Sequence, residues 1–477
     1  MTSIIRWTDV ERPKNRHRRR GADRAPHERG STVPQDTNTH TIARPHRTAR
    51  REQPTPPPES DAARRRGELG RMVGIDFARF LAIIGMFCAH LLPPAGLPGH
   101  VEGVSTIVDG NASTLFAVVG GISVVLATRS YLERGHVAAA RWAMAVRGVL
   151  VILIGATLAL APGSIVVVLV YFGVAMLCSI PFLRVSPRWL LVSAAILAIA
   201  GPILNAFLRQ ALGVVGEGGG VSWPQWGEPA VALRAIFVTG TYPVVTWIVY
   251  VLVGMAVATL LIAARRNGTE KRFLAWTAGI GAFLAVFAVS TSALVYEFFG
   301  RAVLVATLPP EAAAATESII GTPGFGAPLS PQWWALLLQT PHTGTTLDIL
   351  RGVGIALFVI ASMLFLAGVL PKSALRVLEP VRAAGAAPLT VYTVHVLAAA
   401  ATSFVLLSGA VDASTDLPWW YLGPAILGVH ILGAIVIGAI LAALKRRGPL
   451  EALVSSVSGA VARRLGGVPS GGRRRRG

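Results

Sequence analysis

The stretch GIDFARFLAIIGMFCAHLLPP at residues 74–94 decides the class of fold. It is apolar over about the 20 residues that a helix needs to cross a bilayer. The chain is 53% hydrophobic and only 14% charged, whereas soluble proteins carry about 25% charged residues. Further long apolar blocks lie at 148–183, 242–264, 273–296, 352–370 and 420–444. The sequence therefore predicts an all-α, polytopic membrane helix bundle.

Ten membrane spans are expected, and the basic residues between them are distributed unequally. The spans are 73–93, 110–129, 144–161, 164–183, 189–209, 242–264, 273–297, 347–370, 384–408 and 420–444. One set of connections holds 13 Lys and Arg residues: 129–147, 184–188, 265–272 and 371–383. The opposite connections, with the helix ends beside them, hold only Arg209, Arg234, Arg301 and Arg351. Because cytoplasmic loops are enriched in Lys and Arg, both termini are expected in the cytoplasm and the protein in the cell membrane.

Two basic tails flank the expected membrane domain at 72–445. Residues 1–71 are rich in Arg, Pro and Glu without hydrophobic periodicity, a composition typical of disorder. Residues 446–477 form the second tail, in which 450–465 is expected to form a short amphipathic helix on the inner membrane surface. The tails carry most of the net charge of +20. Such basic ends favour cytoplasmic retention and anionic lipid rather than nucleic acid as a partner.

The opening helix carries three ionisable residues, Asp76, Arg79 and His90. At ~100° and ~1.5 Å per residue, all three lie within about 60° of one another, with His90 roughly 16 Å beyond Arg79. Asp76 with Arg79 is also consistent with a structural i,i+3 ion pair, and His90 with a side chain that simply reaches the membrane surface. Their shared face makes them candidates for a functional stripe across the membrane.

Asp109 precedes the second span on the side where His90 ends. A carboxylate facing an imidazole fixes the imidazole's tautomer and raises its basicity, so His90 and Asp109 are the candidate catalytic pair. The alternative for Asp109 is a helix N-cap, and the two roles are compatible.

Five further polar residues are candidates for substrate binding: Tyr242, His342, Asp348, Arg351 and His395. Polar residues that re-enter a membrane beside glycine often line a cavity, as PHTGTTLDILR at 341–351 would. For Tyr242 the alternative is an interfacial aromatic belt. His430 has no companion in its span and is expected to be structural. No metal site is expected, and P-loop, GxSxG and HExxH motifs are missing.

The chain resembles the transmembrane acyltransferases, above all the bacterial heparan-α-glucosaminide N-acetyltransferase-like group, which is related to acyltransferase family 3. The resemblance covers about 72–450. It rests on the DxxR opening with Arg79 and His90 eleven residues apart, on the Asp before LFAVVGGIS, on YPVVTWIVYVLVGM, on LTVYTVH and on GPLE after the last span. One departure is DFARF, where many relatives have Gly after the Arg.

The resemblance implies transfer of an acetyl or other acyl group from cytoplasmic acyl-CoA to a hydroxyl or amine on the outer side, often of a sugar. Asp76 and Arg79 would then face the donor, and His90 would act as general base or transient acyl carrier. No bound cofactor is implied, since acetyl-CoA is a co-substrate. Membrane lipids and an extracytoplasmic glycan are the other partners, and a homodimer stays open. The alternatives are a transporter or flippase of a small molecule or lipid-linked sugar, and a scaffold or sensor without chemistry.

Overall fold

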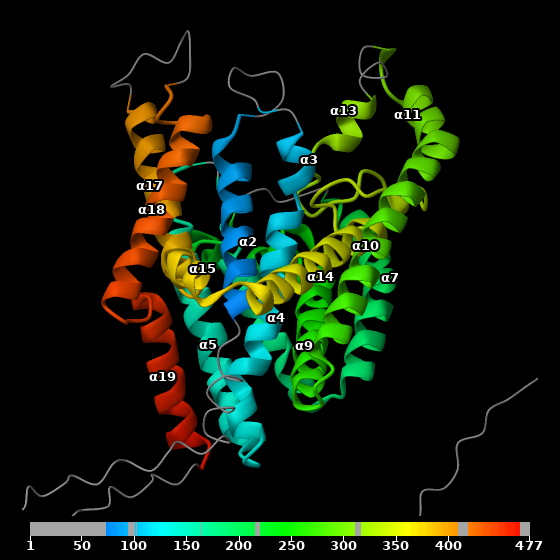
Figure 1. Ribbon diagram of the computed structural model, residues 1–477. Coiled ribbons are helices and arrows are strands. Elements are labelled where there is room, and N and C mark those ends of the chain that lie inside the picture. Colours follow the sequence, from blue (N-terminus) through cyan, green and yellow to red (C-terminus); the bar gives the residue numbers. More distant parts are fainter. Residues whose placement is uncertain are drawn as a thin grey trace, which may run out of the picture. The chain divides into compact units, whose positions relative to one another are not determined.

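The computed structural model describes residues 73–93, 101, 103–163, 165–214, 220–310, 316–408 and 418–467. The long helices are α2 Val73–Leu91, α4 Asn111–Leu132, α5 Val137–Leu158, α7 Pro187–Leu212, α9 Val244–Arg266, α10 Glu270–Val295, α14 Thr346–Val369, α17 Pro388–Leu407 and α18 Pro424–Ala443 (Figure 1). The shorter α-helices are α3 Val104–Val108, α6 Leu169–Cys178, α8 Pro229–Arg234, α11 Arg301–Thr307, α13 Thr316–Gly321, α15 Lys372–Val377, α16 Glu379–Gly385 and α19 Pro449–Leu465. Five single-turn elements complete the fold: η1 Ile180–Arg184, η2 Trp223–Gly227, η3 Ala235–Thr239, η4 Tyr296–Gly300 and η5 Ala335–Leu337.

The predicted all-α membrane bundle is confirmed. Among the described residues, nine helical segments are long and apolar enough to cross a membrane. Two of them are composite: α3 continues into α4, and α10 continues through η4 into α11. The expected tail 1–71 lies outside the described residues.

The fourth expected span, 164–183, differs from the prediction. The chain forms only the ten-residue helix α6 and the short helix η1 there. Ile165 to Val168 precede α6 outside any helix, and β-branched side chains are less favourable in helices because their χ1 rotamers are restricted. Pro181 lies in the first turn of η1, where its ring and its missing N–H prevent α6 from continuing. The apolar run therefore contains a partial crossing beside α5.

Helix α9 lies at the centre of the bundle. Its most apolar window is 83% buried, against 22% for the windows of the α10–α11 segment and of α18. It packs against α4, α6 and α7. Gly121 of α4 and Gly254 of α9 allow the closest approach, because a Cβ on either glycine would overlap a backbone carbonyl of the other helix. Helices α4 and α9 thus form a tightly packed core.

Replacing Gly254 with valine is expected to destabilise the protein by about 1–3 kcal/mol, the usual cost of overpacking a core. The added side chain would overlap the Val118 carbonyl oxygen on α4. Thermal unfolding of detergent-solubilised protein measures the effect. Gly279→Ala in α10 is the control, because a Cβ there meets no atom within 4 Å. Equal stability of the Gly254 variant and the wild type would contradict the close α4–α9 packing.

One end of the bundle carries most of the basic residues, and we call it the basic end. It is formed by the α4–α5, η1–α7 and α9–α10 connections and by residues 445–448. Arg266 at the end of α9 forms an ion pair with Glu133 at the end of α4, so these connections lie together. The C-terminal tail contributes α19, which packs along α5 and contacts α17 (Figure 1).

Candidate active site

Asp76 at the start of α2 holds together two arginines. Its Oδ1 accepts from Arg79 at 2.6 Å, and its Oδ2 accepts from Arg382 of α16 at 3.3 Å. Arg382 also binds both oxygens of Glu379, and this hydrogen bonding raises the pKa of Arg382. The second terminal nitrogen of Arg79 donates to the Ser123 hydroxyl of α4 at 2.9 Å. The i,i+3 ion pair considered from the sequence is therefore present, and it belongs to a network that joins α2, α4 and α16.

A cavity of about 490 Å³ opens beside Arg79, and we call it the arginine cavity. Arg79, Arg147 and Arg447 line it together with Glu451 and apolar residues of α4 and α6. The Glu451 carboxylate is engaged elsewhere: it accepts from the backbone N–H groups of Leu389 and Thr390 and from the Thr390 hydroxyl, at the start of α17. Three guanidinium groups thus face the cavity against one carboxylate that caps a helix.

Three histidines from three helices form a chain of hydrogen bonds. His90 Nδ1 of α2 lies 3.0 Å from His395 Nε2 of α17. His395 Nδ1 lies 2.8 Å from His430 Nδ1 of α18. Phe87 stacks on the His395 ring at a centroid distance of 4.1 Å and meets His430 edge-on at 5.8 Å. The bond to His395 leaves His90 Nε2 as its remaining ring nitrogen for a substrate.

On one side of His90 lies an inner cavity of about 30 Å³. Its polar lining is His90, Ser113, Tyr242, His342 and Tyr392. The Tyr242 ring meets the His342 ring edge-on at 5.7 Å, and His342 Nε2 accepts from the Gly110 N–H at 3.0 Å. Burial, with a smaller effect of Arg351, lowers the pKa of His342 to about 4, so this ring is neutral at pH 7. Burial also raises the pKa of Tyr242, which keeps its phenol protonated.

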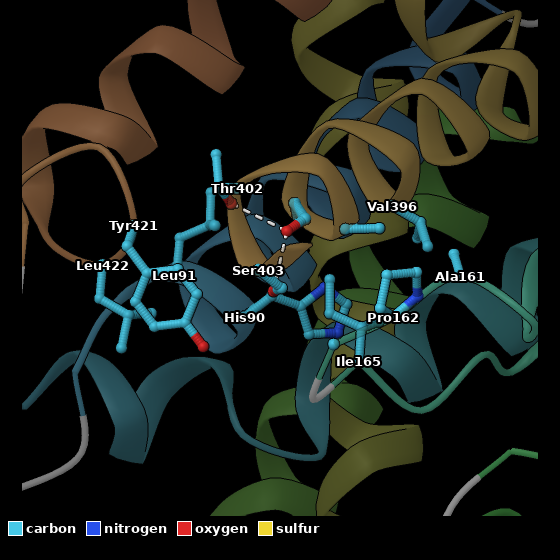
Figure 2. Close-up of a pocket in the computed structure, with 13 residues that line it drawn as sticks. His90, Leu91, Ala161, Pro162, Ile165, Val396, Thr402, Ser403, Tyr421 and Leu422 are labelled. Carbon is cyan, nitrogen blue, oxygen red and sulfur yellow. Dashed lines mark hydrogen bonds between the residues drawn. The ribbon is translucent and has the colours of Figure 1, made fainter. Parts of the chain in front are cut away.

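His90 also lines a second cavity of about 20 Å³, which we call the outer cavity. Figure 2 shows His90 beside Pro162, Thr402, Ser403 and Tyr421 at this cavity. The two hydroxyls on α17 donate to the carbonyl oxygen of Ala399. His90 therefore forms part of the wall between the inner and the outer cavity.

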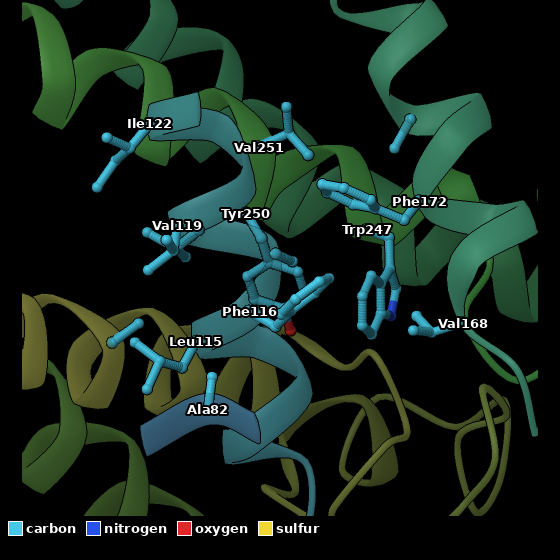
Figure 3. Packing of buried hydrophobic residues seen from close by; sticks show 14 of the residues in the cluster. Ala82, Leu115, Phe116, Val119, Ile122, Val168, Phe172, Trp247, Tyr250 and Val251 are labelled. Atoms are coloured by element: carbon cyan, nitrogen blue, oxygen red, sulfur yellow. The ribbon is translucent and has the colours of Figure 1, made fainter. Parts of the chain in front are cut away.

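Two phenylalanines line the arginine cavity near the residues that line the inner cavity. Phe116 and Phe172 line the arginine cavity with their rings 5.5 Å apart (Figure 3). Ser113, one helical turn before Phe116, lines the inner cavity. Phe172 packs on Gly120, where a Cβ would overlap its ring. Phe116 and Ser113 thus place the two cavities about one turn of α4 apart.

Asp348 and Arg351 brace the turn that holds His342. They form a buried ion pair at 3.0 Å, while Asp348 accepts from the Gly344 N–H and Arg351 donates to Gln339. Arg351 also contacts the backbone carbonyl of Asp109 at 3.4 Å. Within the described residues, the Asp109 carboxylate has no hydrogen bond to His90, whose ring partner is His395. Of the nine site residues predicted from the sequence, three line the inner cavity: His90, Tyr242 and His342. A fourth, His395, contacts His90 through a ring nitrogen.

Sequence reasoning missed three residues of this arrangement. His430 was expected to be structural but ends the histidine chain, and Arg147 and Arg447 line the arginine cavity. The signal for His430 was an ionisable residue inside an apolar span, which by default marks a functional position. Arg147 and Arg447 were visible only as contributors to the charge of the basic end, and Arg447 directly precedes the GPLE motif.

Residues 71–299 match the family described as heparan-alpha-glucosaminide N-acetyltransferase, catalytic. The match covers 229 of the 477 residues and supports the chain's resemblance to these acyltransferases. No curated protein matches the chain. The matched range includes Asp76, Arg79, His90, Asp109 and Tyr242. The second half of the candidate site, with His342, His395 and His430, lies outside that range and rests on the geometry alone.

Proposed function

We propose that this protein transfers an acetyl or other acyl group from cytoplasmic acyl-CoA to a hydroxyl or amine of an extracytoplasmic acceptor, with a sugar as the favoured class. The observation that carries the proposal is the position of His90 in the wall between the inner and outer cavities. A transfer across a membrane needs one reactive group that donor and acceptor reach from opposite sides. The family match supports acetyl transfer to an amino sugar.

The donor would bind in the arginine cavity. Guanidinium groups bind phosphates in bidentate geometry, and Arg79, Arg147 and Arg447 supply three of them. By the positive-inside rule the basic end would face the cytoplasm of a cell membrane, where acyl-CoA is available. The pantetheine arm would pass Phe116 and Phe172 and bring the thioester into the inner cavity.

The chemistry would take place at His90. As general base, Nε2 removes the proton from the acceptor's hydroxyl or amine while that group attacks the thioester carbonyl. The tetrahedral intermediate then expels the CoA sulfur, which takes up the proton, so that a C–O or C–N bond replaces the C–S bond. Tyr242 and Tyr392 line the same cavity, and their hydroxyls are candidate donors to the developing oxyanion. As acyl carrier, His90 would instead receive the acyl group itself and pass it on.

The acceptor would enter through the outer cavity. Thr402, Ser403 and Tyr421 supply hydroxyls there beside apolar side chains, a lining that suits a sugar hydroxyl or amine. His90 is the residue common to this cavity and the inner one.

Replacing Arg147 or Arg447 with methionine is expected to raise the KM for acetyl-CoA about 10- to 100-fold with little change in kcat, because a hydrogen bond to a charged group contributes roughly 1.5–3 kcal/mol. Radiolabelled acetyl-CoA and glucosamine, supplied on opposite sides of proteoliposomes, measure the transfer. Arg141→Met, at an exposed position of α5, is the control. If folded wild-type protein neither binds acetyl-CoA nor transfers the label, the acyltransferase proposal fails and transport becomes the better explanation.

A further inference from the structure

We propose that His395 and His430 are positioning residues that carry protons to and from His90, so that the three imidazoles act as one acid–base unit. This proposal rests on the proposed acyl transfer at His90. The two ring contacts of 3.0 and 2.8 Å involve both nitrogens of His395. His395 is 2% exposed and lies between the other two rings. A side chain with both nitrogens bonded to neighbouring imidazoles has no nitrogen left for a substrate, which argues against His395 as a direct substrate ligand.

Hydrogen-bonding rules couple the three tautomers. A neutral imidazole has one donor and one acceptor nitrogen, so each ring-to-ring contact holds one proton. When His90 donates from Nδ1, His395 must accept at Nε2 and donate from Nδ1 to His430. His90 Nε2 then has no proton and faces the substrate as a base. In the opposite arrangement His90 Nε2 carries the proton. The tautomer of His430, with its proton on Nε2 or on Nδ1, is thus coupled to whether His90 Nε2 is a base or an acid.

The three hydrogen-bonded histidines can take up and return the one proton that moves during acyl transfer. The acceptor's proton moves to His90 Nε2, the Nδ1 proton of His90 moves to His395 Nε2, and the Nδ1 proton of His395 moves to His430. His430 is then an imidazolium two rings from the reacting atoms, while the acceptor bonds to the acyl carbon. When the C–S bond breaks, the three transfers reverse and His90 Nε2–H protonates the CoA sulfur. No proton is gained or lost overall.

The surroundings of the three histidines favour proton transfer between them. Among the described residues, no carboxylate forms a hydrogen bond or ion pair with any of the three rings. A carboxylate is the usual partner that orients a catalytic histidine, and here an imidazole occupies that position. Within the described part of the chain, His342, which also lines the inner cavity, acts on His90 electrostatically. Phe87 of α2 packs on both His395 and His430 and fixes their ring planes.

A cavity of about 170 Å³ between α17 and α18 makes the proposal testable. His395 and His430 line it together with Phe87 and aliphatic residues such as Val394 and Val429. Removing the His430 side chain would enlarge this cavity next to His395. Free imidazole is then small enough to occupy the position of the lost ring and to accept the proton from His395 Nδ1.

The test is the His430→Ala variant in the proteoliposome transfer assay, with and without imidazole. We expect kcat to fall about 10- to 100-fold, part of the factor that general acid–base catalysis contributes, while the KM for acetyl-CoA stays unchanged. Imidazole should restore a large part of kcat. The control is Val394→Ala, which enlarges the same cavity but leaves the three histidines in place. It should keep full activity and show no response to imidazole. An unchanged kcat in His430→Ala, or a loss that imidazole does not restore, overturns the relay.

A second measurement separates failure of the relay from failure of the acyltransferase proposal. In protein with ¹⁵N-labelled histidine, NMR reports which ring nitrogens carry protons. We expect His430→Ala to change the His90 ring signals, although the two rings are joined only through His395. Unchanged His90 signals overturn the relay whether or not the enzyme is active. Coupled signals in a wild type that transfers no acyl group support the proton chain and refute the proposed function.

Discussion

Replacing His90 with alanine is expected to lower kcat for acyl transfer by about 10²- to 10⁴-fold, the range that a positioned general base contributes. Acetyl-CoA binding should be nearly unchanged, because the arginine cavity does not include His90. The reason for the large effect is position: His90 is the residue that both the inner and the outer cavity share. Transfer kinetics in proteoliposomes and a separate acetyl-CoA binding titration measure the two quantities.

The control for this variant is His136→Ala, which removes a histidine in the α4–α5 connection at the basic end. It should leave kcat and KM unchanged. The same preparation also decides between the two roles of His90. Quenching wild-type protein after mixing with labelled acetyl-CoA, without acceptor, traps labelled protein only if His90 carries the acyl group. A His90→Ala enzyme with normal kcat would refute both roles.

Much of the fold could be predicted because membrane helices have a strong local signal. A bilayer requires about 20 apolar residues in a helix. Blocks of that length predicted seven of the nine apolar helical segments to within seven residues at each end, whereas α3–α4 begins six residues earlier and α10–α11 ends ten residues later than expected. The exception among the ten expected spans, 164–183, is apolar enough to cross. A hydropathy average does not reveal that the β-branched residues at 165–168 and Pro181 shorten helix α6, because it counts only how apolar the residues are.

The candidate site was less predictable, because its contacts join distant parts of the chain. The shared face of Asp76, Arg79 and His90 followed from helix geometry within α2. That Arg382 would pair with Asp76, 306 residues away, had no local signal. Nor did the contact of His395 with His90, which lies across 305 residues. Sequence position suggested Asp109 as the partner of His90, whereas the packing of α17 against α2 supplies an imidazole instead.

Replacing Asp76 with alanine is expected to destabilise the protein by about 3–5 kcal/mol, because removing one partner of a buried ion pair leaves an uncompensated charge. Asp76 is 7% exposed and pairs with both Arg79 and Arg382. Arg382 keeps Glu379 as a partner, so Arg79 is the charge left without an ion pair. Thermal unfolding in detergent measures the loss. Glu297→Ala is the control, since its ion pair with Arg301 is exposed and contributes about 1 kcal/mol or less.

The double variant Asp76→Ala, Arg79→Met tests whether the unpaired charge is the cause. Removing the Arg79 charge as well should restore part of the lost stability, because an apolar side chain of similar length tolerates burial. The double variant should still bind acetyl-CoA weakly, since Arg79 is one of three guanidiniums in the arginine cavity. Asp76 has its two oxygens engaged by protein partners, which argues for an indirect role in donor binding through Arg79. If Asp76→Ala keeps wild-type stability and loses only acetyl-CoA affinity, Asp76 contacts the donor directly and the ion-pair network is not what holds α2 to α16.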